Sequence, residues 1–137
     1  MTNGDKEVAG AHPCRVLAVD DNRDSADSMA MLLRLWGHEV QVAYDGPSAL
    51  TLAQEHKPEV VLLDLGLPKM TGYEVARRLR EELGLTGAMF VALTGYGQEK
   101  DRRLTEEAGF CEHLVKPVEP AALEGLLHHL CRKARAG

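Results

Sequence analysis

The sequence contains no long apolar run and no segment that resembles an export signal. Apolar runs such as Val60–Leu63 are only a few residues long, whereas a helix that spans a bilayer needs about 20 residues. Residues 1–12 mix Asp, Lys, Glu and Gly without an apolar centre, so we expect no secretory signal there. These features predict a cytoplasmic protein without membrane insertion.

Cysteine is scarce, and its spacing favours no special chemistry. Cys14, Cys111 and Cys131 lie far apart and form no C-x-x-C pair. This spacing indicates neither a disulfide framework nor a zinc site. We expect all three to be small hydrophobic residues that are buried or half-buried.

An excess of positive charge is also missing. The chain has 16 Lys and Arg against 21 Asp and Glu, a net charge of −5, and its basic cluster, Arg132–Arg135, lies near the end of the sequence. Because affinity for a phosphate backbone depends on clustered Lys and Arg, we expect no nucleic-acid partner. The 137 residues suffice for one domain. We predict a domain at 14–133, a flexible segment at 1–13 and a tail at 134–137.

Short apolar runs alternate with segments of helical periodicity, a pattern typical of repeated βα units. Strands are expected at Val16–Val19, Val40–Ala43, Val60–Leu63, Met89–Leu93 and His113–Val115. Helices are expected around Ala26–Trp36, ending at Gly37, at Pro47–Glu55, Tyr73–Leu83 and Gln98–Ala108, and around Leu123–Leu130. In the fourth helix the apolar stripe consists of Leu104 and Ala108. Five units cannot close an eight-stranded barrel, so we predict an α/β fold with an open, doubly wound parallel sheet.

Polar residues follow the apolar runs where the strands are expected to end. They are Asp20, Asp21, Asp64, Thr94 and Lys116. In doubly wound sheets the ligand crevice opens at the carboxyl ends of the strands, and the strand order 2-1-3-4-5 makes strands one and three neighbours there. The sequence therefore predicts that three carboxylates converge at one edge of the sheet.

Three adjacent carboxylates repel one another unless some are protonated or a cation holds them. Oxygen ligands without His or Cys favour Mg²⁺ or Mn²⁺, and a magnesium site with few protein ligands commonly takes others from a phosphate. Three carboxylates, one divalent ion and the ammonium of Lys116 sum to zero charge, which leaves room for an anionic phosphoryl group. The set therefore favours phosphoryl transfer, which needs mainly positioning and neutralisation of charge.

Each residue also has an ordinary structural explanation. An Asp at a βα turn is often a helix N-cap, and we expect Asn22 and Asp24 to be caps. A Lys before Pro117 is commonly a surface residue, and Thr94 alone could form a turn. The coincidence of all five residues at strand ends is what favours a site.

Four motifs resemble the receiver domain of two-component response regulators, the family of the chemotaxis response regulator. They are Val-Leu-Ala-Val-Asp20-Asp21-Asn, Val-Val-Leu-Leu-Asp64-Leu-Gly-Leu-Pro68, Ala-Leu-Thr94-Gly and Leu-Val-Lys116-Pro117. The resemblance covers residues 15–132 and implies a flavodoxin-like sheet with the order 2-1-3-4-5.

The resemblance implies a role for each residue at the expected sheet edge. Asp64 would accept a phosphoryl group from a histidine kinase or a histidine phosphotransfer protein. Asp21, Asp64 and the backbone carbonyl of Gly66 would bind Mg²⁺ directly, and Asp20 largely through water. Lys116 would pair with the phosphoryl oxygens, and the hydroxyl of Thr94 would donate to one of them. The peptide bond before Pro117 would be cis.

In the family, phosphorylation switches the surface formed by the fourth helix, the fifth strand and the fifth helix. Most receivers have Tyr or Phe at the switch position, where this chain has His113. His113 could switch rotamers on the output surface, or it could be an ordinary residue of an edge strand. Gly66 and Tyr96 occupy positions that tune the access of water to the acyl phosphate, and we expect Tyr96 to screen it partly.

Other functions are considered beside this one. A phosphohydrolase of the haloacid-dehalogenase type needs a second Asp two residues after the nucleophile, and Gly66 occupies that position. A docking module that is never phosphorylated is the main alternative. The resemblance implies a protein that catalyses only its own phosphorylation and dephosphorylation. We therefore expect a signalling switch and not an enzyme. A downstream protein target and a homodimer are left open.

Overall fold

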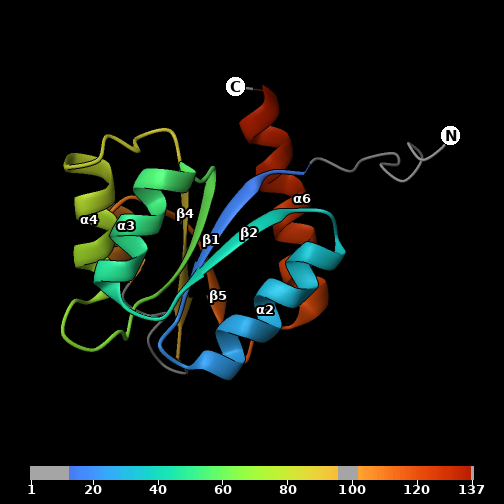
Figure 1. Cartoon of the computed structure of the whole chain (residues 1–137), viewed down its shortest axis with the longest axis horizontal. Coiled ribbons are helices and arrows are strands. Elements are labelled where there is room, and N and C mark those ends of the chain that lie inside the picture. Colours follow the sequence, from blue (N-terminus) through green and yellow to red (C-terminus); the bar gives the residue numbers. More distant parts are fainter. Residues whose placement is uncertain (1–12, 96–101, 137) are drawn as a thin grey trace, which may run out of the picture.

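The computed structural model of the chain describes residues 13–95 and 102–136, in which strands and helices alternate. The elements are β1 (Arg15–Val19), α2 (Arg23–Leu35), β2 (Glu39–Ala43), α3 (Gly46–His56), β3 (Val60–Asp64), α4 (Gly72–Glu81), β4 (Met89–Thr94), α5 (Arg102–Glu107), β5 (Phe110–Val115) and α6 (Pro120–Ala136) (Figure 1). Among these described helices, none combines the length and apolarity needed to cross a membrane. The predicted alternation of strands and helices is confirmed.

The five strands form one parallel sheet in the order β2-β1-β3-β4-β5, as predicted. β1 pairs with both β2 and β3, and Val19 lies opposite Leu63 in the register. The carboxyl ends of β1 and β3 therefore lie side by side. This pairing brings the residues that follow β1 next to Asp64, the last residue of β3.

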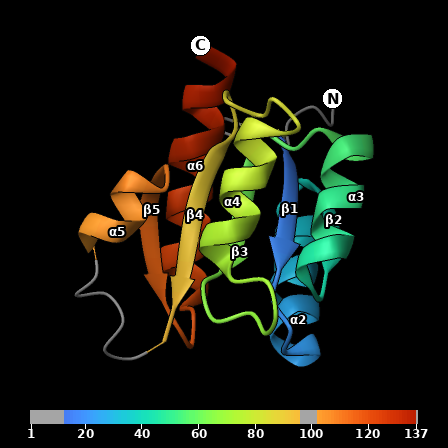
Figure 2. The same ribbon diagram turned by 90° about the vertical axis from the view of Figure 1, so that its left-hand side faces the viewer.

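Helices cover both faces of the sheet. Alternate residues of each central strand point to opposite faces: Val16 and Ala18 pack on the side of α2 and α6, and Leu17 and Val19 pack on the side of α3 and α4. The same arrangement of layers is visible in Figures 1 and 2. Strands buried on both faces are apolar throughout, which explains why the runs are continuous and not alternating.

The ends of α2 follow from local chemistry. Asn22 is the N-cap, because its side-chain oxygen accepts a hydrogen bond from the Ser25 backbone N–H at 3.0 Å. Asp24 is not a cap, contrary to the prediction. It lies in the first helical turn, where a negative charge interacts favourably with the helix dipole. Gly37, with φ of 97°, ends the helix as predicted, since a left-handed residue is favoured there.

The expected helix Gln98–Ala108 is only partly within the described residues, where α5 begins at Arg102. Its apolar stripe was predicted correctly at Ala108, which packs against the core, and wrongly at Leu104. Leu104 is 53% exposed, whereas Thr105 is buried. Thr105 faces β5, where its hydroxyl lies 2.6 Å from Nε2 of His113. A polar pair thus takes the position that a hydrophobic contact was expected to fill.

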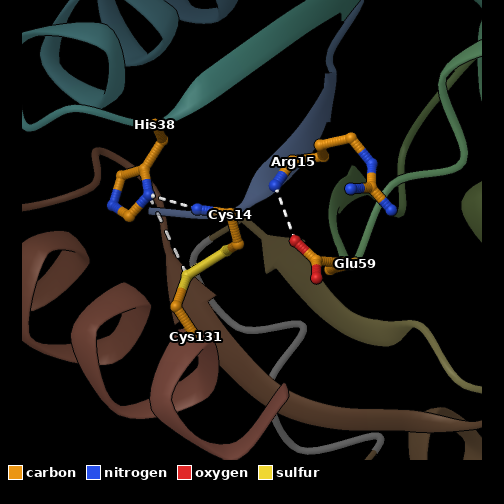
Figure 3. The surroundings of a disulfide bond; sticks show 5 residues. All are labelled: Cys14, Arg15, His38, Glu59 and Cys131. Carbon is orange, nitrogen blue, oxygen red and sulfur yellow. Dashed lines mark hydrogen bonds between the residues drawn. A yellow bond between two sulfur atoms is a disulfide. The ribbon is translucent and has the colours of Figure 1, made fainter. Parts of the chain in front are cut away.

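Cys14 and Cys131 are buried as predicted, but the expectations of no disulfide and of a buried or half-buried Cys111 were wrong. Cys14 and Cys131 form a disulfide with their Cα atoms 5.9 Å apart, although 117 positions separate them in sequence. Cys111 is free and exposed. Rules based on spacing consider cysteines that are close in sequence, but here the fold places the residue before β1 against the last turns of α6. Figure 3 shows this arrangement.

Gly72 allows α4 to begin directly behind the end of β3. A Cβ atom at Gly72 would lie 2.5 Å from the backbone oxygen of Asp64 and 2.8 Å from Cα of Leu65. The Gly72 N–H also donates a hydrogen bond to the backbone oxygen of Leu65 at 3.3 Å. A glycine is required here because the neighbouring atoms belong to the backbone, which cannot move aside cheaply.

We expect Gly72→Ala to lower the free energy of unfolding by about 2 kcal/mol, because overpacked positions typically cost 1–3 kcal/mol. Urea denaturation measures the change. Gly125→Ala in α6 is the control, since nothing lies within 4 Å of its added Cβ. That variant should be more stable by up to about 1 kcal/mol, as expected for Gly→Ala within a helix. Equal stability of Gly72→Ala and the wild type would contradict the packing argument.

Candidate functional site

The carboxyl edge of the sheet brings together the polar residues that the sequence singled out. Asp20 follows β1, Asp64 ends β3, Thr94 ends β4 and Lys116 follows β5. The backbone holds two of these positions together, because the Lys116 N–H donates to the Thr94 carbonyl at 2.8 Å. The predicted convergence of side chains from separate strand ends is confirmed.

Three carboxylates form the centre of the site. One carboxylate oxygen from each of Asp20, Asp21 and Asp64 lies within 4.8 Å of the others. Asp20 is 1% exposed and Asp64 is 6% exposed, whereas Asp21 is exposed to solvent. The cluster is therefore buried on the side of the sheet and accessible from outside at Asp21.

Lys116 supplies the positive charge in this cluster. Its Nζ lies 3.0 Å from Oδ2 of Asp20 and 3.3 Å from Oδ2 of Asp64. Burial by itself would lower the pKa of Lys116, but the two carboxylates outweigh that effect and raise the pKa above its usual range. The ammonium group is therefore held in its charged form between two acids.

One ammonium group does not fully compensate the carboxylates. Burial is the main reason why the pKa of Asp20 is raised, and the nearby Asp64 carboxylate adds to that effect. The Asn22 backbone N–H, 3.0 Å from Oδ1 of Asp20, and Lys116 act in the opposite direction. A further positive charge at this place would stabilise the ionised form of Asp20.

One hydrogen-bond donor contacts Asp64, and another ends the neighbouring strand β4. The Gly66 backbone N–H donates to Oδ1 of Asp64 at 2.9 Å. The hydroxyl oxygen of Thr94 is buried, and it has no hydrogen-bond partner among the residues that the structure describes. Because a buried hydroxyl without a partner costs free energy, Thr94 has an unused donor for an oxygen atom that arrives at this edge.

The donor set fits a hard divalent cation. Its members are carboxylate oxygens, without a His or Cys side chain among them, and Mg²⁺ and Mn²⁺ prefer oxygen ligands. Three carboxylates, when ionised, carry more formal negative charge than the one ammonium group of Lys116 balances. Asp20, Asp21 and Asp64 are therefore the residues that would hold the ion.

The remaining predicted residues lie in different places. The Lys116–Pro117 peptide bond is cis, as the resemblance implied, and Pro117 lines a cavity of about 290 Å³ next to Asp20 and Lys116. His113 lies outside the acidic cluster, on β5 opposite Ala92 of β4. Tyr96 lies outside the described residues, so its predicted screening role stays a prediction.

Sequence reasoning missed two residues that support these groups. Gly72 packs behind the backbone of Asp64, and Thr105 contacts His113. A glycine at the start of a predicted helix could have signalled a close backbone approach. No sequence signal distinguished Thr105 from other polar residues of its helix, because its burial depends on the packing of α5 against β5.

Comparisons with known proteins agree with this geometry. The sequence model described as "Response regulator receiver domain" matches residues 16–128. An uncharacterized 14.6 kDa protein of Leptolyngbya boryana is 34% identical over 116 residues, which are 85% of this chain and 88% of that protein. The DNA-binding response regulator MtrA of Mycobacterium tuberculosis is 38% identical over 109 residues, 80% of this chain and 46% of MtrA. This chain thus spans about half the length of MtrA.

Solved structures show the same fold. The crystal structure of a CheY-like response regulator receiver domain protein from Methanospirillum hungatei has a TM-score of 0.82 and 25% sequence identity, and the match covers 90% of this chain and 98% of that one. Its fold, the matched family model and the acidic cluster at the end of the sheet lead to one assignment. The chain belongs to the response regulator receiver domain family.

Proposed function

We propose that this receiver domain is the phosphoacceptor of a two-component phosphorelay and that Asp64 carries the phosphoryl group. The observation that supports this most strongly is the surroundings of the Asp64 carboxylate. Lys116 lies 3.3 Å from one of its oxygens, and the Gly66 N–H donates to the other. The hydroxyl of Thr94 is buried at the same sheet edge, and no partner for it lies among residues 13–95 and 102–136. These groups could position and neutralise a phosphoryl group.

The transfer is a substitution at phosphorus. A carboxylate oxygen of Asp64 forms a bond to phosphorus while the bond between phosphorus and the imidazole nitrogen of a partner phosphohistidine breaks. The electron pair stays on that nitrogen, which takes up a proton. Lys116 then pairs with the oxygens of the new acyl phosphate, and the Thr94 hydroxyl donates to one of them.

A divalent ion bound by Asp20, Asp21 and Asp64 would neutralise the charge that builds up on the phosphoryl oxygens. The Gly66 carbonyl is a further proposed ligand, and we propose that Asp20 acts largely through water. Mg²⁺ is the proposed cofactor, with Mn²⁺ as a substitute. Before transfer, the chain's own contribution is to hold the carboxylate of Asp64 beside Lys116 and to keep the hydroxyl of Thr94 at the same edge of the sheet.

We propose that the domain acts in the cytoplasm and that a histidine kinase or a histidine phosphotransfer protein is the donor. MtrA is named as DNA-binding, and that activity is not transferred to this chain, which has no excess of basic residues. We propose that the domain, at 14–133, acts as a signalling switch and passes its state to another protein through contact. The formation of a homodimer is left open.

The contact between Thr105 and His113 is the proposed link to the output surface. Their side chains lie 2.6 Å apart and join α5 to β5, the edge strand of the sheet. His113 is half-buried, unlike a simple surface residue. β5 also ends beside Thr94, which pairs with Val115 in the register. A movement of Thr94 toward a phosphoryl group could therefore reach His113 through β4 and β5.

Phosphorylation of the chain should require both Asp64 and a divalent ion. With Mg²⁺ and a small acyl phosphate, we expect the intact mass of the wild type to increase by one phosphoryl group, and Asp64→Asn to gain none. EDTA should abolish the gain. Asp24→Asn is the matched control, because Asp24 lies in the nearby first turn of α2 outside the acidic cluster. It should be phosphorylated like the wild type.

A rapidly hydrolysed phosphate could escape this measurement, so a purified phosphohistidine donor with radioactive phosphate is the second reagent. Transfer of label to the wild type and not to Asp64→Asn supports the proposal. If neither the acyl phosphate nor the phosphohistidine donor labels Asp64, the chain is a docking module and the proposed function is wrong.

Phosphorylation of Asp64 should change the surroundings of His113. When Asp64 is phosphorylated, we expect the imidazole NMR signals of His113 to shift, because its contact with Thr105 rearranges. His128 on α6 is exposed and serves as the internal control, with unchanged signals. Unchanged signals of both residues in a fully phosphorylated sample would identify His113 as an ordinary edge-strand residue.

The contact between Thr105 and His113 should also stabilise the unphosphorylated protein. Thr105→Val keeps the shape of the side chain and removes its hydroxyl, so we expect the free energy of unfolding to fall by about 1 kcal/mol, the typical net value of a buried hydrogen bond. Ser28→Ala at an exposed position of α2 should change it by less than about 0.5 kcal/mol. Equal effects of the two substitutions in thermal denaturation would contradict a stabilising role for the contact.

A further inference from the structure

A second cluster of potential ligands lies at the opposite end of β1 from the acidic site. Cys14 directly precedes β1, His38 precedes β2, and Cys131 belongs to α6. One ligand atom from each of the three lies within 4.8 Å of the others. Cys14 is 3% exposed and Cys131 is fully buried, whereas His38 is half-buried. The proposed phosphorelay function uses none of them.

The imidazole of His38 is already directed toward the sulfur atoms (Figure 3). Its Nδ1 lies 3.9 Å from Sγ of Cys131 and accepts a hydrogen bond from the Cys14 backbone N–H at 3.2 Å. With Zn–S bonds of about 2.3 Å and Zn–N bonds of about 2.0 Å, the sulfur and nitrogen ligands of a tetrahedral zinc ion are about 3.5 Å apart. The observed separation is close to that value.

We propose that Cys14, His38 and Cys131 bind one Zn²⁺ ion when the two cysteines are reduced. The disulfide and the metal site are then alternative states of the same residues. Both states connect the start of β1 to the end of α6, two segments at opposite ends of the domain's sequence. The inference concerns a different site from the phosphoacceptor and does not depend on it.

The chemistry of the two states balances. A dithiol or two small thiols reduce the Cys14–Cys131 bond by thiol–disulfide exchange, which supplies two electrons and two protons and leaves the reductant as a disulfide. Zn²⁺ then displaces the two thiol protons, and two thiolates balance its charge. The Nδ1 atom of His38 must exchange its hydrogen bond with the Cys14 N–H for the metal. A water molecule could take the fourth position from the exposed side of His38.

The surroundings favour zinc over a hard cation. Thiolate and imidazole are ligands that zinc prefers, and the cluster offers two sulfur atoms and one imidazole nitrogen. Glu59 does not take part, since its carboxylate accepts a hydrogen bond from the Arg15 backbone N–H at 2.9 Å and lies away from the sulfur atoms (Figure 3). In a reducing compartment, a close pair of cysteines is more often a metal site than a disulfide.

The test is zinc binding by the reduced full-length chain, measured by competition with a chromophoric chelator in excess Mg²⁺, which occupies the acidic site. We expect one equivalent of Zn²⁺, and Co²⁺ in its place should give the absorption band of a cobalt–thiolate bond. Oxidised protein should bind no zinc at this site. Cys111→Ser is the matched control, because Cys111 is exposed and outside the cluster, and it should bind like the wild type.

Two kinds of variant separate a metal site from a mere pair of thiols. Cys131→Ser should lose binding, and His38→Asn should weaken it by about tenfold or more while the disulfide still forms under oxidising conditions. Circular dichroism of reduced His38→Asn, compared with its oxidised form, shows whether the reduced variant is folded when its zinc binding is measured. The proposal is overturned if reduced wild type binds no more zinc than Cys131→Ser, or if His38→Asn keeps the wild-type affinity.

Discussion

The ion pairs between Lys116 and the two buried carboxylates are the interaction on which the rest of the site depends. Asp20 and Asp64 carry like charges at adjacent strand ends, and Lys116 Nζ lies 3.0 and 3.3 Å from their oxygens. A cluster of buried acids would otherwise repel or take up protons. The contacts depend on the strand order, which places β1 beside β3, and on the position of Lys116 directly after β5 at the same edge of the sheet. The fold thus concentrates charge at one edge and supplies only part of the compensation.

Much of this edge could be predicted from sequence, since strands buried on both faces leave a plain signal, and polar residues where they end share one edge of a parallel sheet. Asp20, Asp64, Thr94 and Lys116 were identified in this way. Features set by packing between distant segments could not be predicted. The burial of Thr105 in place of Leu104 depends on how α5 lies on β5, and the Cys14–Cys131 pair joins segments 117 positions apart.

The two ends of β1 carry different chemistry on the same framework. At the carboxyl end, oxygen ligands surround a place suited to a hard cation. At the amino end, sulfur and nitrogen ligands lie between β1, β2 and α6. Oxygen ligands favour hard cations, whereas sulfur and nitrogen ligands favour zinc. The two sites could therefore be occupied independently. The two clusters lie at opposite ends of β1, and they share no residue.

In this account, repulsion among the carboxylates of Asp20, Asp21 and Asp64 destabilises the folded chain, and a bound divalent ion relieves that repulsion. The most direct measurement is the melting temperature of the oxidised chain as a function of Mg²⁺ concentration, for the wild type and for Asp21→Asn. A ligand that binds only the folded state raises stability with its concentration. The account predicts that Mg²⁺ raises the melting temperature of the wild type, whereas Asp21→Asn, which has one carboxylate charge less, melts higher without Mg²⁺ and responds much less to it. Equal behaviour of the two proteins at every Mg²⁺ concentration would contradict it.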